Sequence, residues 1–487
     1  MMDLVVTKKN EAFIHIDCER SLSQELSDYF TFQVPGYQFV PAYKNKLWDG
    51  KIRLFDLRTN QIYYGLIPYI RKFCSDRKYS IAFHKDVELE ENFSLKEAED
   101  FISTLNTPFE PKDYQKAAFV QAIRSRRILL LSPTASGKSF IQYLIVRYIQ
   151  QQCNKGLLIV PTTSLVEQMY TDFKSYGYDV ESFCHRQYSG KEKHTNKFLT
   201  ITTWQSIYNL DKSYFEQFDF VLGDEAHQFK AKSLTTIMSG LSNARYRIGC
   251  TGTLDGTKTH KLVLEGLFGP VLKVTTTKEL IDKNVLSEFR IKCLILKYPE
   301  DICQQSRKWD YQKEIEYIVM NVHRNNFIKN LVLSLEGNSL VLFQFVEKQG
   351  KQLFNIVQSE AKDRKVFFIF GGTEVETRES IRAITEKENN SIIIASYGTF
   401  STGINIRNLH NVIFASPSKS RVRNLQSIGR GLRKGDNKEI ATLFDIADDL
   451  RIGKHTNFTL NHFIERVKIY DEEKFAYKFY NIELKNG

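Results

Sequence analysis

From residue 108 to residue 453, short apolar runs alternate with longer stretches in which apolar side chains recur every three or four positions. The short runs predict buried strands, and the longer stretches predict helices. Regular alternation of the two is typical of a parallel sheet with helices on both faces. We therefore expect an α/β fold with two tandem parallel-sheet domains, over residues 108–285 and 286–453. Their predicted strands are residues 128–131, 157–160, 199–202, 218–222 and 247–250, then residues 340–345, 366–369, 392–395, 412–415 and 440–444.

The two ends of the chain follow other patterns. Residues 1–100 mix short strand-like runs with helical ones, which predicts a separate small α/β or α+β domain. Its last part, from Asp86 to Asp100, is acidic and predicts a solvated helix face and a linker. Residues 454–487 have the spacing of an amphipathic helix, and we expect a C-terminal helical extension that packs rather than acts.

Composition removes several classes of protein. The chain has 487 residues, enough for about three domains, and 42% of them are hydrophobic, which is unlike a disordered or fibrous chain. No apolar run approaches 18 residues and the first residues are polar, so we expect no membrane span, no secretory signal and a cytoplasmic protein. The seven scattered cysteines predict reduced thiols rather than a zinc site. A net charge of +11 fits a polyanionic partner.

A phosphate-binding loop is the clearest chemical motif. The segment 132–139, Ser-Pro-Thr-Ala-Ser-Gly-Lys-Ser, lies between a predicted strand and a predicted helix. Backbone N–H groups and the helix N-terminus in such a loop cradle a triphosphate, with Lys138 on the β- and γ-phosphates and Ser139 on Mg²⁺. Ser132 replaces the usual first glycine, so this motif alone leaves a chance match or a small-molecule kinase open. The predicted nucleotide contacts are Pro133, Thr134, Ala135, Ser136, Gly137, Lys138 and Ser139.

An acidic pair follows the predicted strand 218–222. Asp224 suits a hold on Mg²⁺, and Glu225 suits positioning or deprotonating the attacking water. The alternative is a solvated acidic turn, which the preceding strand and the upstream phosphate loop disfavour. His227 either couples nucleotide state to motion or hydrogen-bonds locally.

Two arginines near the C-terminus complete the candidate chemistry. Arg430 and Arg433 are three residues apart, so a helix would place both on one face. Guanidinium groups stabilise charge on a phosphoryl group in transfer, which predicts arginine fingers supplied by the second domain. Considered without the phosphate loop, the same residues would instead indicate a basic helix on the protein surface.

Residues 42–78 carry nine basic and three acidic residues among several aromatic ones. Cations neutralise phosphates and rings stack on bases, so we expect a nucleic-acid surface that includes Lys44, Lys46, Lys51 and Arg53. The alternative is that Trp48 and Phe55 are core residues and the cations a solvated face.

The order of the motifs over residues 110–450 resembles superfamily 2 helicases and translocases, whose box Asp-Glu-Ala-His matches residues 224–227. Positions matching the family's adenine and nucleotide contacts are Tyr114, Gln115, Gly403 and Gln426. Positions matching its strand-contacting motifs are Pro161, Thr162, Thr203, Trp204, Gln205, Gly372, Thr373 and Ser396. Positions matching its coupling motif are Thr251, Gly252 and Thr253. Residues 16–19, 48–54 and 395–403 further resemble the UvsW-type recombination helicases of T-even phages.

The resemblance implies two RecA-like domains with ATP and Mg²⁺ in a cleft between them, and a small N-terminal nucleic-acid-binding domain. It implies a monomer that works on DNA, especially forks, four-way junctions and R-loops, with single-strand-binding and recombination proteins as candidate partners and the host cytoplasm as location. Three alternatives stay open on the residues: an RNA-dependent ATPase, the motor subunit of a restriction complex, and an annealing protein that uses nucleotide only as a switch.

Overall fold

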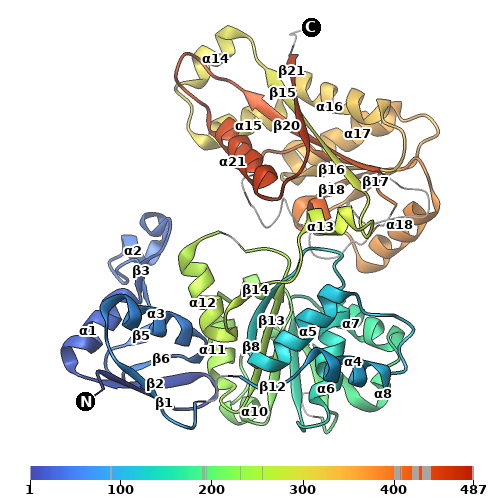
Figure 1. Ribbon diagram of the computed structural model, residues 1–487. Coiled ribbons are helices and arrows are strands. Elements are labelled where there is room, and N and C mark those ends of the chain that lie inside the picture. The colour runs from blue at the N-terminus through green and yellow to red at the C-terminus, as the bar shows by residue number, and fades with distance from the viewer. Residues whose placement is uncertain are drawn as a thin grey trace. The chain divides into compact units, whose positions relative to one another are not determined.

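The computed structural model describes residues 2–87, 90–188, 192, 195–230, 232–254, 256–399, 406, 408–418, 420, 427–429 and 440–484. The chain forms two compact units (Figure 1). The first comprises Met1–Ser132 and Gly137–Val274, and the second comprises Pro133–Ser136 and Thr275–Gly487. No helix within the described residues is long and apolar enough to cross a membrane.

The N-terminal module of the first unit is built on a mixed sheet of five strands in the order β5-β6-β2-β1-β7. Pairs β1–β2, β2–β6 and β5–β6 are antiparallel, whereas β1 and β7 are parallel, as expected for a small α+β domain. Its elements are β1 Leu4–Lys8, β2 Phe13–Cys18, α1 Arg20–Tyr29, β5 Phe55–Asp56, β6 Gln61–Tyr63, η2 Tyr64–Leu66, α3 Ile67–Arg77 and β7 Ile81–Phe83. A separate two-stranded ribbon, β3 Thr31–Gln33 with β4 Lys51–Arg53, carries η1 Tyr37–Phe39 and α2 Pro41–Lys44.

The first core domain is a parallel sheet of seven strands in the order β10-β11-β9-β12-β13-β8-β14. Successive side chains of one strand point to opposite faces, so Ile128 and Leu130 of β8 join one apolar cluster and Leu129 joins another. This two-sided burial explains the unbroken apolar runs of the sequence. The strands are β8 Arg127–Leu131, β9 Gly156–Val160, β10 Cys184–Gln187, β11 Leu199–Thr203, β12 Phe220–Gly223, β13 Tyr246–Thr251 and β14 Val271–Lys273. The main helices are α5 Asp113–Ser125, α6 Lys138–Ile149, α7 Thr163–Ser175, α11 Lys232–Gly240 and α12 Lys258–Phe268.

The second unit holds another parallel sheet of seven strands, in the order β17-β18-β16-β19-β20-β15-β21. The two parallel sheets confirm the predicted α/β fold class. The strands are β15 Glu288–Lys297, β16 Ser339–Phe343, β17 Val366–Ile369, β18 Ile392–Ser396, β19 Asn411–Phe414, β20 Ile440–Asp449 and β21 Tyr477–Glu483. The main helices are α15 Tyr311–Met320, α16 Val322–Ser334, α17 Lys351–Glu360, α18 Val375–Lys387 and α21 Phe458–Glu472.

The C-terminal extension is only partly helical, which corrects the sequence prediction. Helix α21 is present, but residues 477–483 form β21, which pairs in parallel with β15 from Ile291↔Tyr477 to Lys297↔Glu483. Lys474 adopts a left-handed φ of 58° just after α21, and the next residues, rich in aromatic side chains, favour a strand. The sheet of the second unit therefore includes residues beyond 453. The domain limits 1–100, 108–285, 286–453 and 454–487 stay predictions.

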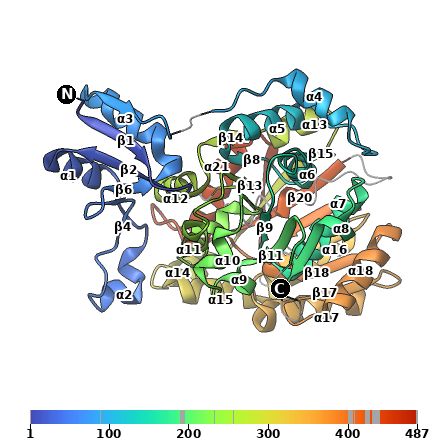
Figure 2. The same ribbon diagram turned by 90° about the horizontal axis from the view of Figure 1, so that it is seen from below.

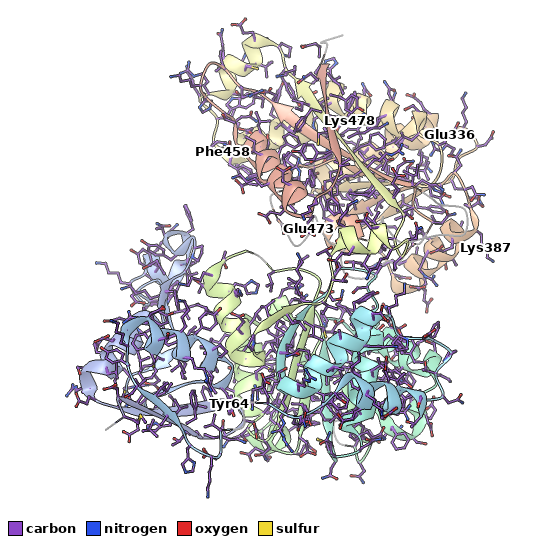
Figure 3. The ribbon with its side chains drawn as sticks, viewed as in Figure 1. Tyr64, Glu336, Lys387, Phe458, Glu473 and Lys478 are labelled. Carbon is purple, nitrogen blue, oxygen red and sulfur yellow. The ribbon has the colours of Figure 1, made fainter. Side chains whose placement is uncertain are left out.

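The N-terminal module and the first core domain share one apolar core. A single cluster joins Leu4, Ile14 and Phe73 of the module to Leu264 and Phe268 of α12. Polar contacts border it: the Tyr69 hydroxyl donates to Glu265 Oε2 at 2.6 Å, and Arg127 lies 4.0 Å from the ring centre of Tyr64, which Figure 3 labels. Since burial of apolar surface is the main stabilising force, this module is an integral part of the first unit.

Part of the acidic stretch is also not the solvated linker that the sequence predicted. Glu91 Oε1 accepts hydrogen bonds from Arg126 at 2.5 Å, from Arg245 at 3.1 Å and from the Tyr246 hydroxyl at 2.9 Å. Two guanidinium groups and the hydroxyl of the buried Tyr246 bind the Glu91 carboxylate. In the sequence pattern Glu91 is only one of several acidic residues, so this role was not predicted. Glu91 thus fixes the start of this segment to the first core domain.

Candidate nucleotide site and its neighbours

The phosphate loop begins where β8 ends and closes at the first residue of α6. Ser132 N–H donates to Thr251 O at 2.9 Å, which joins the loop to β13. Gly137 has a φ of 80°, and a Cβ atom there would lie 2.4 Å from Gln115 Nε2. The glycine therefore provides both the left-handed turn and the space for the Gln115 amide. Ala135 is also left-handed, with a φ of 66°.

The predicted adenine-reading pair lies at the start of α5. Gln115 is buried and its Oε1 accepts from Lys112 N–H at 2.9 Å, which leaves the amide nitrogen beside Gly137. Tyr114 is half-buried, and burial raises the pKa of its phenol. The structure therefore brings Gln115, which belongs to α5, next to Gly137 of the phosphate loop.

Lys138 and Ser139 are the first two residues of α6. Lys138 Nζ donates to Ser132 O at 3.3 Å, so the ammonium group lies over the loop. Ser139 Oγ lies 2.8 Å from the hydroxyl of Tyr176, whose pKa burial raises to about 12. Sequence reasoning missed Tyr176, because nothing near residue 176 resembles a nucleotide motif.

Asp224 and Glu225 follow β12. Asp224 is buried, and Gln142 Nε2 donates to its Oδ1 at 3.2 Å. Burial raises the pKa of Asp224 to about 6, helped by the neighbouring charge of Glu225 and opposed by that of Lys138. Gln142 was also missed, although it lies four residues after Lys138 and so on the same face of α6. Glu225 has a left-handed φ of 46°, a backbone strain that is common at functional positions.

These groups suit Mg²⁺. Carboxylate and hydroxyl oxygens are the hard ligands that this ion prefers, and Asp224 and Ser139 supply one of each. A buried carboxyl with a raised pKa also indicates a negative charge that the fold compensates incompletely. A cation bound to Asp224 would provide that compensation.

The predicted coupling residues meet in one hydrogen-bonded cluster at the ends of β12 and β13. His227 Nδ1 lies 3.1 Å from Thr251 Oγ1, and Thr251 Oγ1 donates to Thr253 O at 2.9 Å. His227 Nδ1 is also 3.3 Å from Glu225 Oε2, a contact that becomes an ion pair only with a protonated imidazole. His260 of α12, which sequence reasoning missed, places Nε2 2.8 Å from His227 O. Gly252 lies between the two threonines in the chain.

The motifs predicted to contact a nucleic-acid strand follow neighbouring strands of the first sheet. Thr203 of β11 pairs with Val160 of β9, so Pro161 and Thr162 emerge beside Trp204 and Gln205. Three of these residues have local structural roles as well. Thr162 caps α7 through Leu165 N–H, Thr203 Oγ1 lies 2.9 Å from Ser206 Oγ, and the ring of Trp204 lies 5.8 Å from that of Tyr208.

A similar arrangement occurs in the second unit. Gly372 and Thr373 follow β17, and Ser396 ends β18, its direct neighbour in the sheet. Thr373 Oγ1 accepts from Phe370 N–H at 3.0 Å, and Ser396 Oγ lies 2.8 Å from Thr399 Oγ1. Four further predicted residues lie outside the described residues: Gly403, Gln426, Arg430 and Arg433.

The basic residues of the N-terminal module differ in their surroundings. Lys44, Lys46 and Lys51 are exposed, whereas Arg53 forms an ion pair with Asp49 at 2.5 Å. That guanidinium group, by hydrogen bonding, lowers the pKa of Asp49. Phe55 is a core residue, as the alternative interpretation held, but Trp48 is half-buried and belongs to none of the apolar clusters formed by the described residues.

Comparison with known proteins decides the family. Residues 3–84 match the family described as DNA helicase UvsW, N-terminal; residues 108–256 match Type III restriction enzyme, res subunit; and residues 323–435 match the helicase conserved C-terminal domain. The ATP-dependent DNA helicase uvsW of Enterobacteria phage T4 is 34% identical over 510 residues, which cover 99% of this chain and 100% of the phage protein. The chain belongs to the UvsW family of helicases.

Solved structures agree with this assignment. A crystal structure of T4 UvsW has a TM-score of 0.53 and 33% identity, and the match covers 99% of this chain and 100% of that one. A fragment of a putative HsdR subunit of a type I restriction enzyme from Vibrio vulnificus has a TM-score of 0.59 at 16% identity, covering 85% and 74%. At that identity the likeness shows the fold alone. The predicted resemblance to superfamily 2 and to UvsW-type helicases is confirmed, and with it an ATP-dependent helicase.

Proposed function

We propose that this UvsW-family DNA helicase acts on branched DNA, namely forks, four-way junctions and R-loops, and uses ATP hydrolysis to move the branch. The observation that carries the proposal is the N-terminal module, whose exposed lysines belong to a domain that shares its core with the first motor domain. A basic surface fixed to one motor domain must move with it. Duplex held there would be displaced relative to a strand that the motor pulls.

The ATP site is proposed from the residues around the phosphate loop. Lys138 binds the β- and γ-phosphates, and Ser139 and Asp224 are the residues that would hold Mg²⁺, which supplies positive charge against the phosphates. Glu225 orients the attacking water and accepts its proton. By family resemblance we assign charge stabilisation on the transferred phosphoryl group to Arg430 and Arg433, and further nucleotide contacts to Gly403 and Gln426.

The hydrogen-bonded cluster of His227, Thr251 and Thr253 is proposed to carry the nucleotide state to the DNA-contacting motifs. Thr251 ends β13, and its backbone carbonyl accepts from Ser132 at the start of the phosphate loop. A change in the loop therefore reaches β13 through one hydrogen bond. Pro161, Thr162, Thr203, Trp204 and Gln205, with Gly372, Thr373 and Ser396, are the proposed strand contacts.

A substrate panel tests the proposal. ATP turnover and strand separation are measured with a fork, a four-way junction, an R-loop, linear duplex, single-stranded DNA and single-stranded RNA, all at one salt concentration. We expect the branched substrates to be bound most tightly and processed fastest. Equal processing of a fork and a blunt linear duplex would contradict the branched-DNA proposal, and strongest stimulation by RNA would favour an RNA-dependent ATPase.

We further propose a monomer in the host cytoplasm that works beside single-strand-binding and recombination proteins. Light scattering of the purified chain, alone and with a fork, tests the monomer. A mass twice that of one 56.8 kDa chain would contradict it.

A further inference from the structure

A small arm stands out from the N-terminal module. The arm comprises residues 34–50, which connect β3 to β4 and include η1 and α2. Figures 1 and 2 both show α2 at the end of the module opposite β1 and the N-terminus. Gly50 is the only residue of the arm that is fully buried, so the arm contributes almost nothing to the apolar core.

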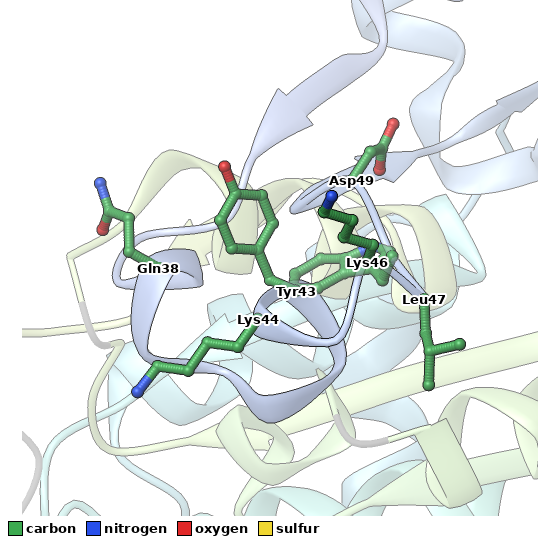
Figure 4. Close-up of a pocket in the computed structure, with 7 residues that line it drawn as sticks. Gln38, Tyr43, Lys44, Lys46, Leu47 and Asp49 are labelled. Carbon is green, nitrogen blue, oxygen red and sulfur yellow. The ribbon is translucent and has the colours of Figure 1, made fainter.

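The arm carries the two most exposed large apolar side chains among the described residues. Leu47 is 81% exposed and Phe39 is 79% exposed. Single exposed apolar side chains are common on soluble proteins, but two such residues at the end of one projection require a reason. Figure 4 shows the Leu47 side chain extending away from the loop that bears it.

Local contacts hold the arm in one shape. Trp48 Nε1 donates to Lys51 O at 2.8 Å, and the backbone N–H groups of Leu47 and Trp48 both donate to Ala42 O. The rings of Tyr37 and Tyr43 meet edge to face at 4.6 Å. Gly50 has a φ of 78°, and a Cβ there would lie 2.6 Å from the Tyr37 ring. The exposed side chains are therefore presented on a defined support rather than on an unstructured loop.

The charge of the arm suits a polyanion. Lys44 and Lys46 are exposed, and within the described part of the chain neither forms an ion pair. Asp49, the single acid of the arm, forms an ion pair with Arg53 at 2.5 Å and accepts a hydrogen bond from Lys51 N–H. An open depression of about 580 Å³ adjoins these lysines and is lined by Gln38, Tyr43, Lys44, Lys46, Leu47, Trp48 and Asp49. In Figure 4, Lys44 and Leu47 extend to opposite sides of it.

We propose that this arm contacts DNA at the branch point, with Phe39 and Leu47 against the exposed face of a base pair and Lys44 and Lys46 on the flanking phosphates. Inside a duplex both faces of each base pair are covered by stacking. At a branch point one face is open, and an apolar side chain that covers it removes apolar surface from water. The inference deepens the proposed function and rests on it. A partner protein would be the other occupant of an apolar arm, but the unpaired lysines favour a polyanion.

The test separates base contacts from phosphate contacts. The double variant Phe39→Ala/Leu47→Ala is compared with wild type, with Lys44→Gln/Lys46→Gln, and with Leu95→Ala as the matched control. Leu95 is 49% exposed and begins α4 Leu95–Ser103, outside the module's arm. The substrates are a fork carrying 2-aminopurine in the base pair at the branch point, and a linear duplex with the same base internally. Fluorescence, affinity at several salt concentrations, fork unwinding and ATP turnover on single strands are recorded.

We expect Phe39→Ala/Leu47→Ala to lower fork unwinding by about tenfold to a hundredfold, the usual scale for stacking on a base. It should remove the protein-dependent change in branch-point fluorescence, while the salt slope of binding and single-strand ATP turnover stay at the wild-type values. Lys44→Gln/Lys46→Gln should lower the salt slope by about two units. Phe39→Trp with Leu47 intact should retain unwinding.

The contrary outcomes are distinct. If wild type prefers the fork but Phe39→Ala/Leu47→Ala unwinds it equally well, the arm inference is wrong and the proposed function stands. If wild type treats fork and linear duplex alike, the proposed function fails and the arm inference fails with it. A loss by Leu95→Ala equal to that of the double variant would also overturn the inference, because the effect would not belong to the arm.

Discussion

The carboxyl of Asp224 lies in the interior of the first unit, where burial raises its pKa from an ordinary 3.8 to about 6. A carboxyl whose pKa is raised in the folded state binds more protons there than in the unfolded chain between pH 4 and pH 6. The free energy of unfolding therefore falls as the pH rises through this window. A shift of this size corresponds to about 3 kcal/mol, so the ionised site is destabilising until a bound cation compensates its charge.

Asp224→Asn should accordingly stabilise the nucleotide-free protein at pH 7.5, by about 1–3 kcal/mol, while it abolishes ATP turnover. The neutral amide removes the charge and keeps an oxygen that can accept from Gln142. The melting temperature is measured between pH 4.5 and pH 7.5, with exposed Asp100→Asn as the control. A variant that melts below wild type at pH 7.5, or that keeps the same pH dependence, would show that Asp224 is already well compensated.

Lys138→Ala and Glu225→Gln should separate ATP binding from hydrolysis. Lys138→Ala removes the positive charge that binds the β- and γ-phosphates. Both ATP binding and ATP turnover should therefore be lost while DNA binding survives. Glu225→Gln keeps the phosphate contacts and removes the base, so turnover should fall by about 10²–10⁴ with binding retained. A fluorescent ATP analogue measures binding and phosphate release measures turnover. Loss of binding in Glu225→Gln would make Glu225 a structural or metal-holding residue.

Among the elements, the prediction from sequence succeeded for the strands that are buried on both faces, whereas of the partly exposed strands in the second unit it found β17 but not β15 or β21. Strands such as β8 and β16 are buried on both faces and appear in the sequence as unbroken apolar runs. Edge strand β21 is largely exposed and has no unbroken apolar run, so the helical spacing of the residues before it was extended over it; its pairing with β15 defines it as a strand. The candidate site divides in the same way. Lys138, Asp224 and Glu225 belong to local motifs, and Gln142 lies one helical turn after Lys138 on α6. Tyr176 and His260 reach the site from other elements and leave no local signal.

The contact between η2 and α12, which joins the N-terminal module to the first core domain, can be tested by a single substitution. A Cβ atom at Gly65 would lie 2.0 Å from Glu265 O and 2.8 Å from Gly266 O, which are backbone atoms of α12 that cannot turn aside. Gly65→Ala should therefore cost about 1–3 kcal/mol of stability through forced separation of the N-terminal module from the first core domain. Gly240→Ala, where the nearest atoms are 3.5 Å away, is the control, and the melting temperature is the measurement. Equal melting temperatures of the two variants would show that the module can shift at this contact at little cost in stability.

At the scale of the whole molecule, the shared core changes how the N-terminal module must be tested. Sequence alone suggests a detachable DNA-binding domain and hence a deletion of residues 1–100. The structure places Leu4, Ile14 and Phe73 in one cluster with Leu264 and Phe268, so that deletion would expose the apolar face of α12. A truncated chain that loses activity would then report on folding rather than on DNA binding.

Neutralising the basic surface avoids that problem, because Lys44, Lys46, Lys51 and Arg53 lie outside the shared core. Changing all four to glutamine should leave ATP turnover on single strands within about twofold of wild type, since the residues around the phosphate loop are intact. Affinity for a fork should fall, and the salt slope of fork binding should drop by about one unit for each phosphate contact that is lost. Arg53 already pairs with Asp49, so Lys44, Lys46 and Lys51 should account for most of the change. Binding isotherms between about 50 and 200 mM salt, where the Debye length is on the order of 10 Å, measure the slope. An unchanged slope at unchanged affinity would mean that these cations form only a solvated face, and that the module serves the motor through the core it shares with it.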